Sequence, residues 1–196
     1  MTPLVVLERG HHASPGWQGA THGDVVEYDL IGWALHGLEH ALRVLGVDVE
    51  RVPGMGSVGQ RQELGEKLIL EHRRRYREAP CVYVSGHFNS AGARAVAFAH
   101  PKSDMGKAIC AVVAEHTPLA ADIANPEGHK GQKNAFACIR HLYDTPNGCC
   151  GILVEFSAVD NVLGEGSDLN SKAYDIGRQV GEALAVALQA QAMETT

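Results

Sequence analysis

The sequence predicts a single α/β domain, in which a mostly parallel, twisted sheet is flanked by helices on both faces. Short apolar runs alternate with longer amphipathic stretches along the chain, as they do in strand–helix units that build parallel sheets. The 196 residues suit one hydrophobic core. The composition, with 45% apolar and 20% charged residues, is that of a globular protein.

The first half of the chain predicts two strand–helix units. Residues 4–7 are an uninterrupted apolar run, typical of a buried strand. Residues 25–45 carry apolar side chains at helical spacing, and Gly46 ends that helix. A second strand over residues 47–52 and an arginine-rich helix over residues 60–78 complete this half.

The second half continues the alternation. The expected strands are short apolar runs, over residues 81–84, 95–99, 135–139 and 151–154. The expected helices are amphipathic and cover residues 104–116 and 171–190. We therefore expect residues 1–190 to form the domain and residues 191–196 a disordered tail.

Several function classes are disfavoured by composition. A net charge of −6 argues against a nucleic-acid-binding surface. The apolar runs are too short to insert into a membrane. The first residues lack the basic segment of a signal peptide, so we expect synthesis in the cytoplasm without export by this route. An odd number of cysteines, without a C-x-x-C pair, indicates reduced, buried thiols.

Three of the predicted strands end in chemically capable residues. His11 follows the first strand, His87 follows the third, and Glu155 lies at the end of the strand over residues 151–154. Ligands of open α/β sheets bind beyond the carboxyl ends of the strands. These three side chains are therefore expected at one edge of the sheet.

Glu27 lies within the apolar stripe of the helix over residues 25–45, in its first turn. One interpretation is a capping box, because Asp24 precedes Glu27 by three residues. The other is a metal ligand, since a buried carboxylate is costly unless it is paired or bound to a metal. Three other polar groups are expected at the same edge of the sheet, which favours the interpretation of Glu27 as a metal ligand.

Two histidines and one carboxylate form the ligand set of a catalytic zinc site with an open position. His11, Glu27 and His87 supply that set for one Zn2+ per chain. Glu155 remains as a glutamate that binds no metal and could transfer protons in amide hydrolysis. Taken singly, each histidine could instead be a hydrogen-bonded loop residue, and Glu155 could form a strand-end salt bridge.

A second zinc motif occurs in the same helix. The segment from His36 to His40, with Glu39, matches H-x-x-E-H. These side chains fall opposite the apolar stripe and away from the start of the helix. We interpret the match as accidental and the residues as a solvated face.

The polar segments together resemble the zinc-dependent N-acetylmuramoyl-L-alanine amidases with an α/β catalytic domain. The segments that carry the resemblance follow one another in order over nearly the whole chain: Val-Leu-Glu-Arg-Gly-His11, Glu27, Ser85-Gly-His87-Phe-Asn89 and Leu153-Val-Glu155-Phe-Ser-Ala-Val-Asp-Asn161. Each segment alone would be weak, whereas the four in order are specific.

The resemblance implies cleavage of the amide bond between N-acetylmuramic acid and L-alanine in peptidoglycan, which is the expected partner. It places Zn2+ on His11, Glu27 and His87. Glu155 is then the general base towards a zinc-bound water and the acid towards the leaving amine. Without a recognisable signal peptide or wall-binding module, we expect a bacteriolytic endolysin of phage or prophage type, acting on the cell wall.

The chain also departs from the family pattern. The usual Asp-x-Gly-His-Gly-Gly opening reads Glu8-Arg-Gly-His-His-Ala13, which makes His12 an alternative ligand, although the Gly-His register favours His11. Gly86 stands where isoleucine is usual. His129 and Lys130 either line the substrate groove or belong to an ordinary surface loop.

These departures keep two other functions open. One is a related zinc amidohydrolase or carboxypeptidase-like hydrolase that acts on a non-murein amide, such as poly-γ-glutamate or an N-acyl amino acid. The other is a non-catalytic wall-binding domain, which would have no chemical need for Glu155. The exact substrate, the phage or bacterial origin and the oligomeric state stay open at this point.

Overall fold

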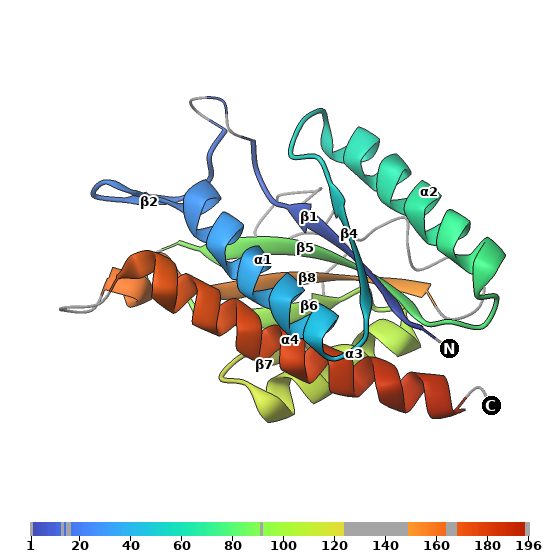
Figure 1. Ribbon diagram of the computed structural model, residues 1–196. Helices are drawn as coiled ribbons and strands as arrows, with labels where there is room; N and C mark the ends of the chain where they lie inside the picture. Colours follow the sequence, from blue (N-terminus) through green and yellow to red (C-terminus); the bar gives the residue numbers. More distant parts are fainter. Residues whose placement is uncertain are drawn as a thin grey trace.

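The fold is described by a computed structural model, which covers residues 2–12, 14, 17–90, 92–123, 149–163 and 168–194. Its six-stranded sheet, shown in Figure 1, consists of β1 (Leu4–Arg9), β4 (Asp48–Val52), β5 (Cys81–Asn89), β6 (Val96–Ala99), β7 (Ala120–Ile123) and β8 (Cys149–Ala158). The strands lie in the order β4-β1-β5-β8-β6-β7. Each neighbouring pair is parallel except β6 and β8, which are antiparallel. The predicted, mostly parallel sheet is confirmed.

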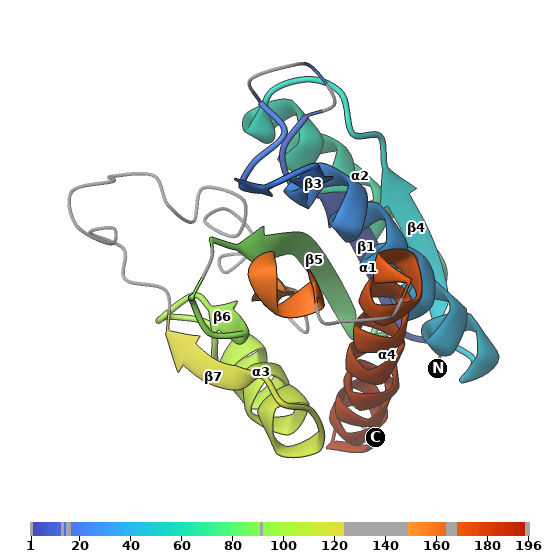
Figure 2. The same ribbon diagram turned by 90° about the vertical axis from the view of Figure 1, so that its left-hand side faces the viewer.

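Helices cover both faces of the sheet. They are α1 (Glu27–Val44), α2 (Val58–Arg75), α3 (Asp104–His116) and α4 (Leu169–Glu194). Side chains of β1 alternate between the faces: Leu4 and Val6 share a cluster with Ile69 of α2, whereas Val5 and Leu7 belong to the larger core. That larger core contains the buried sides of α1, α3 and α4. In the view of Figure 2, α2 lies above β5, whereas α3 and α4 lie below it.

The helices α1 and α4 lie side by side across the sheet (Figure 1). A Cβ atom at Gly177 of α4 would lie 1.8 Å from the carbonyl oxygen of Ala34 in α1. Glycine therefore permits the close approach of these two helices, which together cover the strands that carry the site.

Two predicted strands are longer than the sequence indicates. The strand expected over residues 81–84 continues to Asn89, and the strand expected over residues 151–154 extends over Cys149–Ala158. The reason is that β5 and β8 pair along their whole length, with a register shift between His87 and Asn89. This pairing draws His87 and Glu155 into the sheet rather than leaving them in loops.

Other differences lie at the edges of the fold. Residues 191–194, expected in a disordered tail, continue α4, because no helix-breaking residue interrupts Gln-Ala-Met-Glu. The sequence analysis missed the edge strand β7, whose Ala-Ala-Asp-Ile has weak strand propensity. It also missed the hairpin of β2 (Thr21–His22) and β3 (Val25–Val26) and the short helix η2 (Asp160–Leu163). The strand expected over residues 135–139 lies outside the described residues.

The cysteine prediction agrees with the structure where the chain is described. Cys81, Cys110, Cys149 and Cys150 are free and buried, whereas Cys138 lies outside the described residues. In this part of the chain, no helix combines the length and apolar character that crossing a membrane requires.

Candidate metal centre

The candidate site lies where the carboxyl ends of β1 and β5 meet the first turn of α1. His11 follows β1 by two residues, His87 lies near the end of β5, and Glu27 begins α1. Parallel pairing of β1 with β5 holds the two histidine segments next to each other. The convergence predicted for strand ends is therefore what the fold produces.

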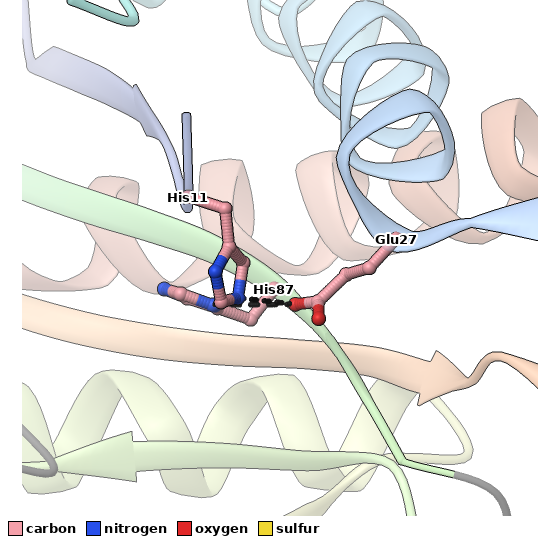
Figure 3. Close-up of side chains that lie close together, drawn as sticks. All are labelled: His11, Glu27 and His87. Carbon is pink, nitrogen blue, oxygen red and sulfur yellow. Dashed lines mark hydrogen bonds and ion pairs between the residues drawn. The ribbon is translucent and has the colours of Figure 1, made fainter. Parts of the chain in front are cut away.

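The nearest donor atoms of the three side chains form a compact triangle, shown in Figure 3. His11 Nε2 lies 3.0 Å from Glu27 Oε1, His87 Nδ1 lies 3.4 Å from the same oxygen, and the two ring nitrogens are 3.2 Å apart. Ligands about 2.0–2.1 Å from a tetrahedral zinc ion would be about 3.3 Å apart. The donor set and its spacing therefore fit Zn2+. Among the described residues, no other group of three such side chains offers a comparable site.

The backbone at Gly10 and His11 is shaped for this site. His11 has a φ of 63°, a left-handed conformation that is uncommon for a residue other than glycine. A Cβ atom at Gly10 would lie 2.4 Å from His87 Cε1 and 2.5 Å from the Gly86 carbonyl oxygen. The Gly-His pair thus lets β1 pass close to the His87 ring and turns His11 towards it.

Glu27 is buried and held by the backbone as well as by the histidines. Its Oε2 accepts a hydrogen bond from Ala20 N at 2.6 Å, and its Oε1 accepts one from Phe88 N at 3.0 Å. Burial raises the pKa of Glu27, but hydrogen bonds to His11, His87 and Ala20 together lower the pKa to about 2. The carboxylate is therefore ready to bind a cation.

The capping-box interpretation of Glu27 is wrong. Helix α1 begins at Glu27 itself, and its N-cap residue is Val26, which makes no side-chain capping bond. A capping box needs Glu at the third helical position. Because the hairpin of β2 and β3 delivers the chain directly into α1, Glu27 occupies the first position and turns towards the histidines.

Glu155 lies on β8 in register with His87 on β5. Its Oε2 is buried without a hydrogen-bond partner in the described structure. Burial raises the pKa of Glu155; the charge of His87 opposes this rise and that of Glu27 adds to it. A half-buried carboxylate beside the triad, with one buried and unsatisfied oxygen, has the features of a group that handles protons.

His12 does not join the site. Its Nδ1 accepts a hydrogen bond from Ser14 N at 3.1 Å, while His11 faces Glu27 and His87. His129 and Lys130 lie outside the described residues.

The H-x-x-E-H match has other partners. Glu39 pairs with Arg43 at 2.9 Å and with Arg51 at 2.5 Å. His40 is hydrogen-bonded to Tyr174 of α4, and His36 and His40 are exposed. The three side chains do not form a donor cluster of their own among the described residues.

Sequence reasoning missed the residues behind His87. Ser85, which is fully buried, contacts His87 Nε2 at 3.3 Å and donates a hydrogen bond to Glu8. Glu8 in turn pairs with Arg61 of α2 at 2.6 Å. The available signal was the charge of Glu8 inside an apolar strand, because a buried charge needs a partner.

No protein-family model matches the sequence, and no curated protein sequence matches it significantly. Solved structures do resemble it. The catalytic domain of CwlV, an N-acetylmuramoyl-L-alanine amidase from Bacillus (Paenibacillus) polymyxa var. colistinus, has a TM-score of 0.61 and 17% identity over 100% of both chains. The N-acetylmuramyl-L-alanine amidase Ami1 from Mycobacterium smegmatis has a TM-score of 0.60 and 15% identity, covering 96% of this chain and 97% of its own.

Cwp6 from Clostridium difficile is similar as well, with a TM-score of 0.64 and 15% identity over 97% of this chain. The chain spans only 29% of the length of Cwp6. At these identities the likeness shows a shared fold, the α/β fold predicted above.

Proposed function

We propose that this chain, which has the fold of N-acetylmuramoyl-L-alanine amidase catalytic domains, is a zinc-dependent amidase that hydrolyses the bond between N-acetylmuramic acid and L-alanine in peptidoglycan. The observation that carries the proposal is the combination, at one sheet edge, of a donor triangle and a separate carboxylate that has one buried, unpartnered oxygen. A metal-binding protein without catalysis needs only the first. Amide hydrolysis needs both.

His11, Glu27 and His87 would hold the metal through the three atoms that already face one another. When bound there, Zn2+ supplies Lewis acidity towards water and towards the scissile carbonyl. The residues themselves provide a rigid donor set, because Glu27 is fixed by two backbone hydrogen bonds and Gly10 sets the spacing of β1 and His87.

Glu155 would act as the general base and then as the general acid. Its unsatisfied Oε2 can accept a proton from the attacking water and deliver that proton to the amine of L-alanine as the amide C–N bond breaks. Its raised pKa brings the carboxyl closer to neutrality, where accepting and returning a proton are better balanced.

The substrate assignment is supported by the structural neighbours and by the motif resemblance. Both CwlV and Ami1 are described as N-acetylmuramoyl-L-alanine amidases, and each matches this chain over nearly its full length. The order of the polar segments along the chain also resembles that of the amidase family. A substrate in peptidoglycan places the action of the protein at the cell wall.

The test is mass spectrometry of purified peptidoglycan after digestion. The zinc-loaded wild-type protein should release stem peptides that begin at L-alanine. A chelator-treated sample and the Glu155→Gln variant should release none or far less, by about 100-fold or more for a lost general base. Adding Zn2+ back should restore the chelated wild type but leave Glu155→Gln inactive.

Intact peptidoglycan after treatment with folded, zinc-loaded wild type would contradict the murein assignment and direct the search to other amides. Equal release by wild type and Glu155→Gln would contradict the role of Glu155. Binding to peptidoglycan without cleavage, unchanged by Glu155→Gln, would indicate a wall-binding domain.

A further inference from the structure

A series of buried hydrogen bonds extends from the His87 ring, on the side of the ring opposite Glu27. The His87 ring presents Nδ1 to the triangle, at 3.2 Å from His11 Nε2, and presents Nε2 to Ser85 Oγ at 3.3 Å. Ser85 Oγ donates a hydrogen bond to Glu8 Oε2. Glu8 Oε1 accepts one from Arg61 Nε at 2.6 Å.

The residues of this hydrogen-bond series lie on three different elements and are almost completely buried. Glu8 is 1% exposed on β1, Ser85 is 0% exposed on β5, and Arg61 is 6% exposed on α2. Arg61 also donates to the Gly56 carbonyl oxygen at 2.9 Å, just before α2 begins. Groups so buried keep a fixed orientation because each hydrogen bond depends on the next.

The direction of these hydrogen bonds determines which nitrogen of His87 faces Ser85 as a donor. Glu8 pairs with the Arg61 guanidinium, and a carboxylate can only accept hydrogen bonds. The single proton of the Ser85 hydroxyl therefore goes to Glu8, and Ser85 Oγ is left to accept. Its remaining partner is His87 Nε2, which then donates to it, so that Nδ1 is the nitrogen presented to the donor triangle.

A purely structural role would not require Ser85. The ion pair between Glu8 and Arg61 already ties α2 to the sheet, and it would persist with alanine at position 85. What Ser85 adds is the contact that connects the ion pair to the His87 ring.

We propose that Ser85, Glu8 and Arg61 are positioning residues that hold His87 in the Nε2-protonated form and direct its Nδ1 towards the metal. The inference rests on the metal centre of the proposed function. It adds to that centre a hydrogen-bonded support that begins in α2, on the face of the sheet opposite α1. Support of this kind commonly changes metal affinity by about 10- to 100-fold when it is removed.

The first experiment measures Zn2+ affinity by competition with a chromophoric chelator. The variants are Ser85→Ala and Glu8→Gln, the latter preserving side-chain shape if Ser85→Ala fails to fold. Ser103→Ala is the matched control, since Ser103 is also buried and its hydroxyl caps α3 outside the site. We expect affinity to fall by about 10-fold or more in the first two variants and to stay at the wild-type value in the control.

The second experiment observes the ring directly in the zinc-loaded protein. Two-bond 1H–15N correlation spectra should show His87 binding the metal through Nδ1 with its proton on Nε2 in wild type, and a mixture of binding through Nδ1 and Nε2 in Ser85→Ala. Substituting Co2+ for Zn2+ should give different ligand-field spectra for the two proteins. A residue that only stabilised the fold would change neither signal.

The outcomes separate the two proposals. Wild-type protein that binds no Zn2+ would overturn the metal centre and the support with it. Wild-type binding that Ser85→Ala and Glu8→Gln leave unchanged, within about twofold, would overturn the support alone. A zinc-loaded wild-type His87 ring that binds through Nε2 and carries its proton on Nδ1 would also overturn it, whatever the affinities.

Discussion

The two acidic residues at the centre of the site have opposite electrostatic environments. Glu27 accepts hydrogen bonds from both backbone and histidine donors, and its pKa falls to about 2. Glu155 is half-buried, its Oε2 is buried without a hydrogen-bond partner, and its pKa rises because of burial. Neighbouring carboxyl groups whose pKa values shift in opposite directions can serve different catalytic roles. Here one is suited to hold a cation and the other to move a proton.

Glu155→Gln is expected to stabilise the metal-free protein at neutral pH. A group whose pKa is raised on folding favours the folded state below its unfolded pKa, and this contribution is lost as the pH rises through the folded pKa. At neutral pH the Glu155 charge is therefore destabilising, and glutamine removes it. Thermal unfolding at pH 7 with a chelator present should show a higher Tm for the variant.

The control for this change is Glu39→Gln. The pKa of Glu39 is lowered: burial raises it, but hydrogen bonds with Arg43 and Arg51 outweigh that effect. Losing this charge should leave the Tm unchanged or lower it, with a loss in the free energy of unfolding of at most about 1 kcal/mol for a partly exposed pair. A lower Tm in Glu155→Gln than in wild type would contradict the interpretation that burial disfavours the ionised form of Glu155.

Glu27 should make the metal-free protein sensitive to acid. Its folded pKa of about 2 lies below the ordinary value of 4.5, so its contribution is present above the unfolded pKa and is lost as the pH falls towards 2. Urea unfolding between pH 7 and pH 3 should give a steeper loss of free energy for wild type than for Glu27→Gln. Parallel curves for the two proteins would contradict this expectation.

At the scale of elements, the site depends on how closely β1 and β5 approach each other. Gly10 N donates to the Gly86 carbonyl oxygen at 3.0 Å, and there is no room for a Cβ atom at Gly10 between that oxygen and the His87 ring. The ring cannot move away without losing the Ser85 contact on its far nitrogen. The glycine before His11 is therefore a requirement of the strand packing.

Gly10→Ala should weaken Zn2+ binding and destabilise the fold, by about 1–3 kcal/mol for an overpacked site. Gly59→Ala is the matched control, because the nearest atom to its Cβ would be Ser57 Oγ at 3.9 Å. It should be neutral or stabilise α2 by about 0.5–1 kcal/mol. Chemical denaturation and zinc titration of both variants test this, and wild-type zinc affinity in Gly10→Ala would contradict it.

For the whole molecule, metal binding should be a source of stability. A bound ion would connect β1, α1 and β5, whose ligands lie far apart in the sequence. At free Zn2+ about 100 times above its dissociation constant, binding adds about 2.7 kcal/mol. For a chain of this size, that corresponds to a rise in Tm of about 5–10 °C.

Differential scanning calorimetry with Zn2+ and with a chelator measures this difference. The His87→Ala variant serves as the control and should unfold at the same temperature in both conditions. An unchanged Tm for wild type on chelation would count against a bound metal at this site.

Much of the fold and the site could be predicted from sequence because both follow from local patterns. Apolar runs marked the central strands, and the parallel arrangement then required residues after β1 and within β5 to meet at one edge. The edge strand β7 was missed because its residues have weak strand propensity and, within the described sheet, it has β6 as its only neighbour, whereas the opposite edge strand β4 was predicted.

The sequence by itself determined the fold class and the four chemically capable residues, His11, Glu27, His87 and Glu155, because periodicity and strand ends are local properties of the chain. Tertiary structure alone decided that His11 rather than His12 faces the site, through a φ of 63°. It also decided that Glu27 is not a cap, and that Ser85 links His87 to Glu8 and Arg61. Those outcomes depend on distances between side chains from separate segments, which spacing along one chain does not specify.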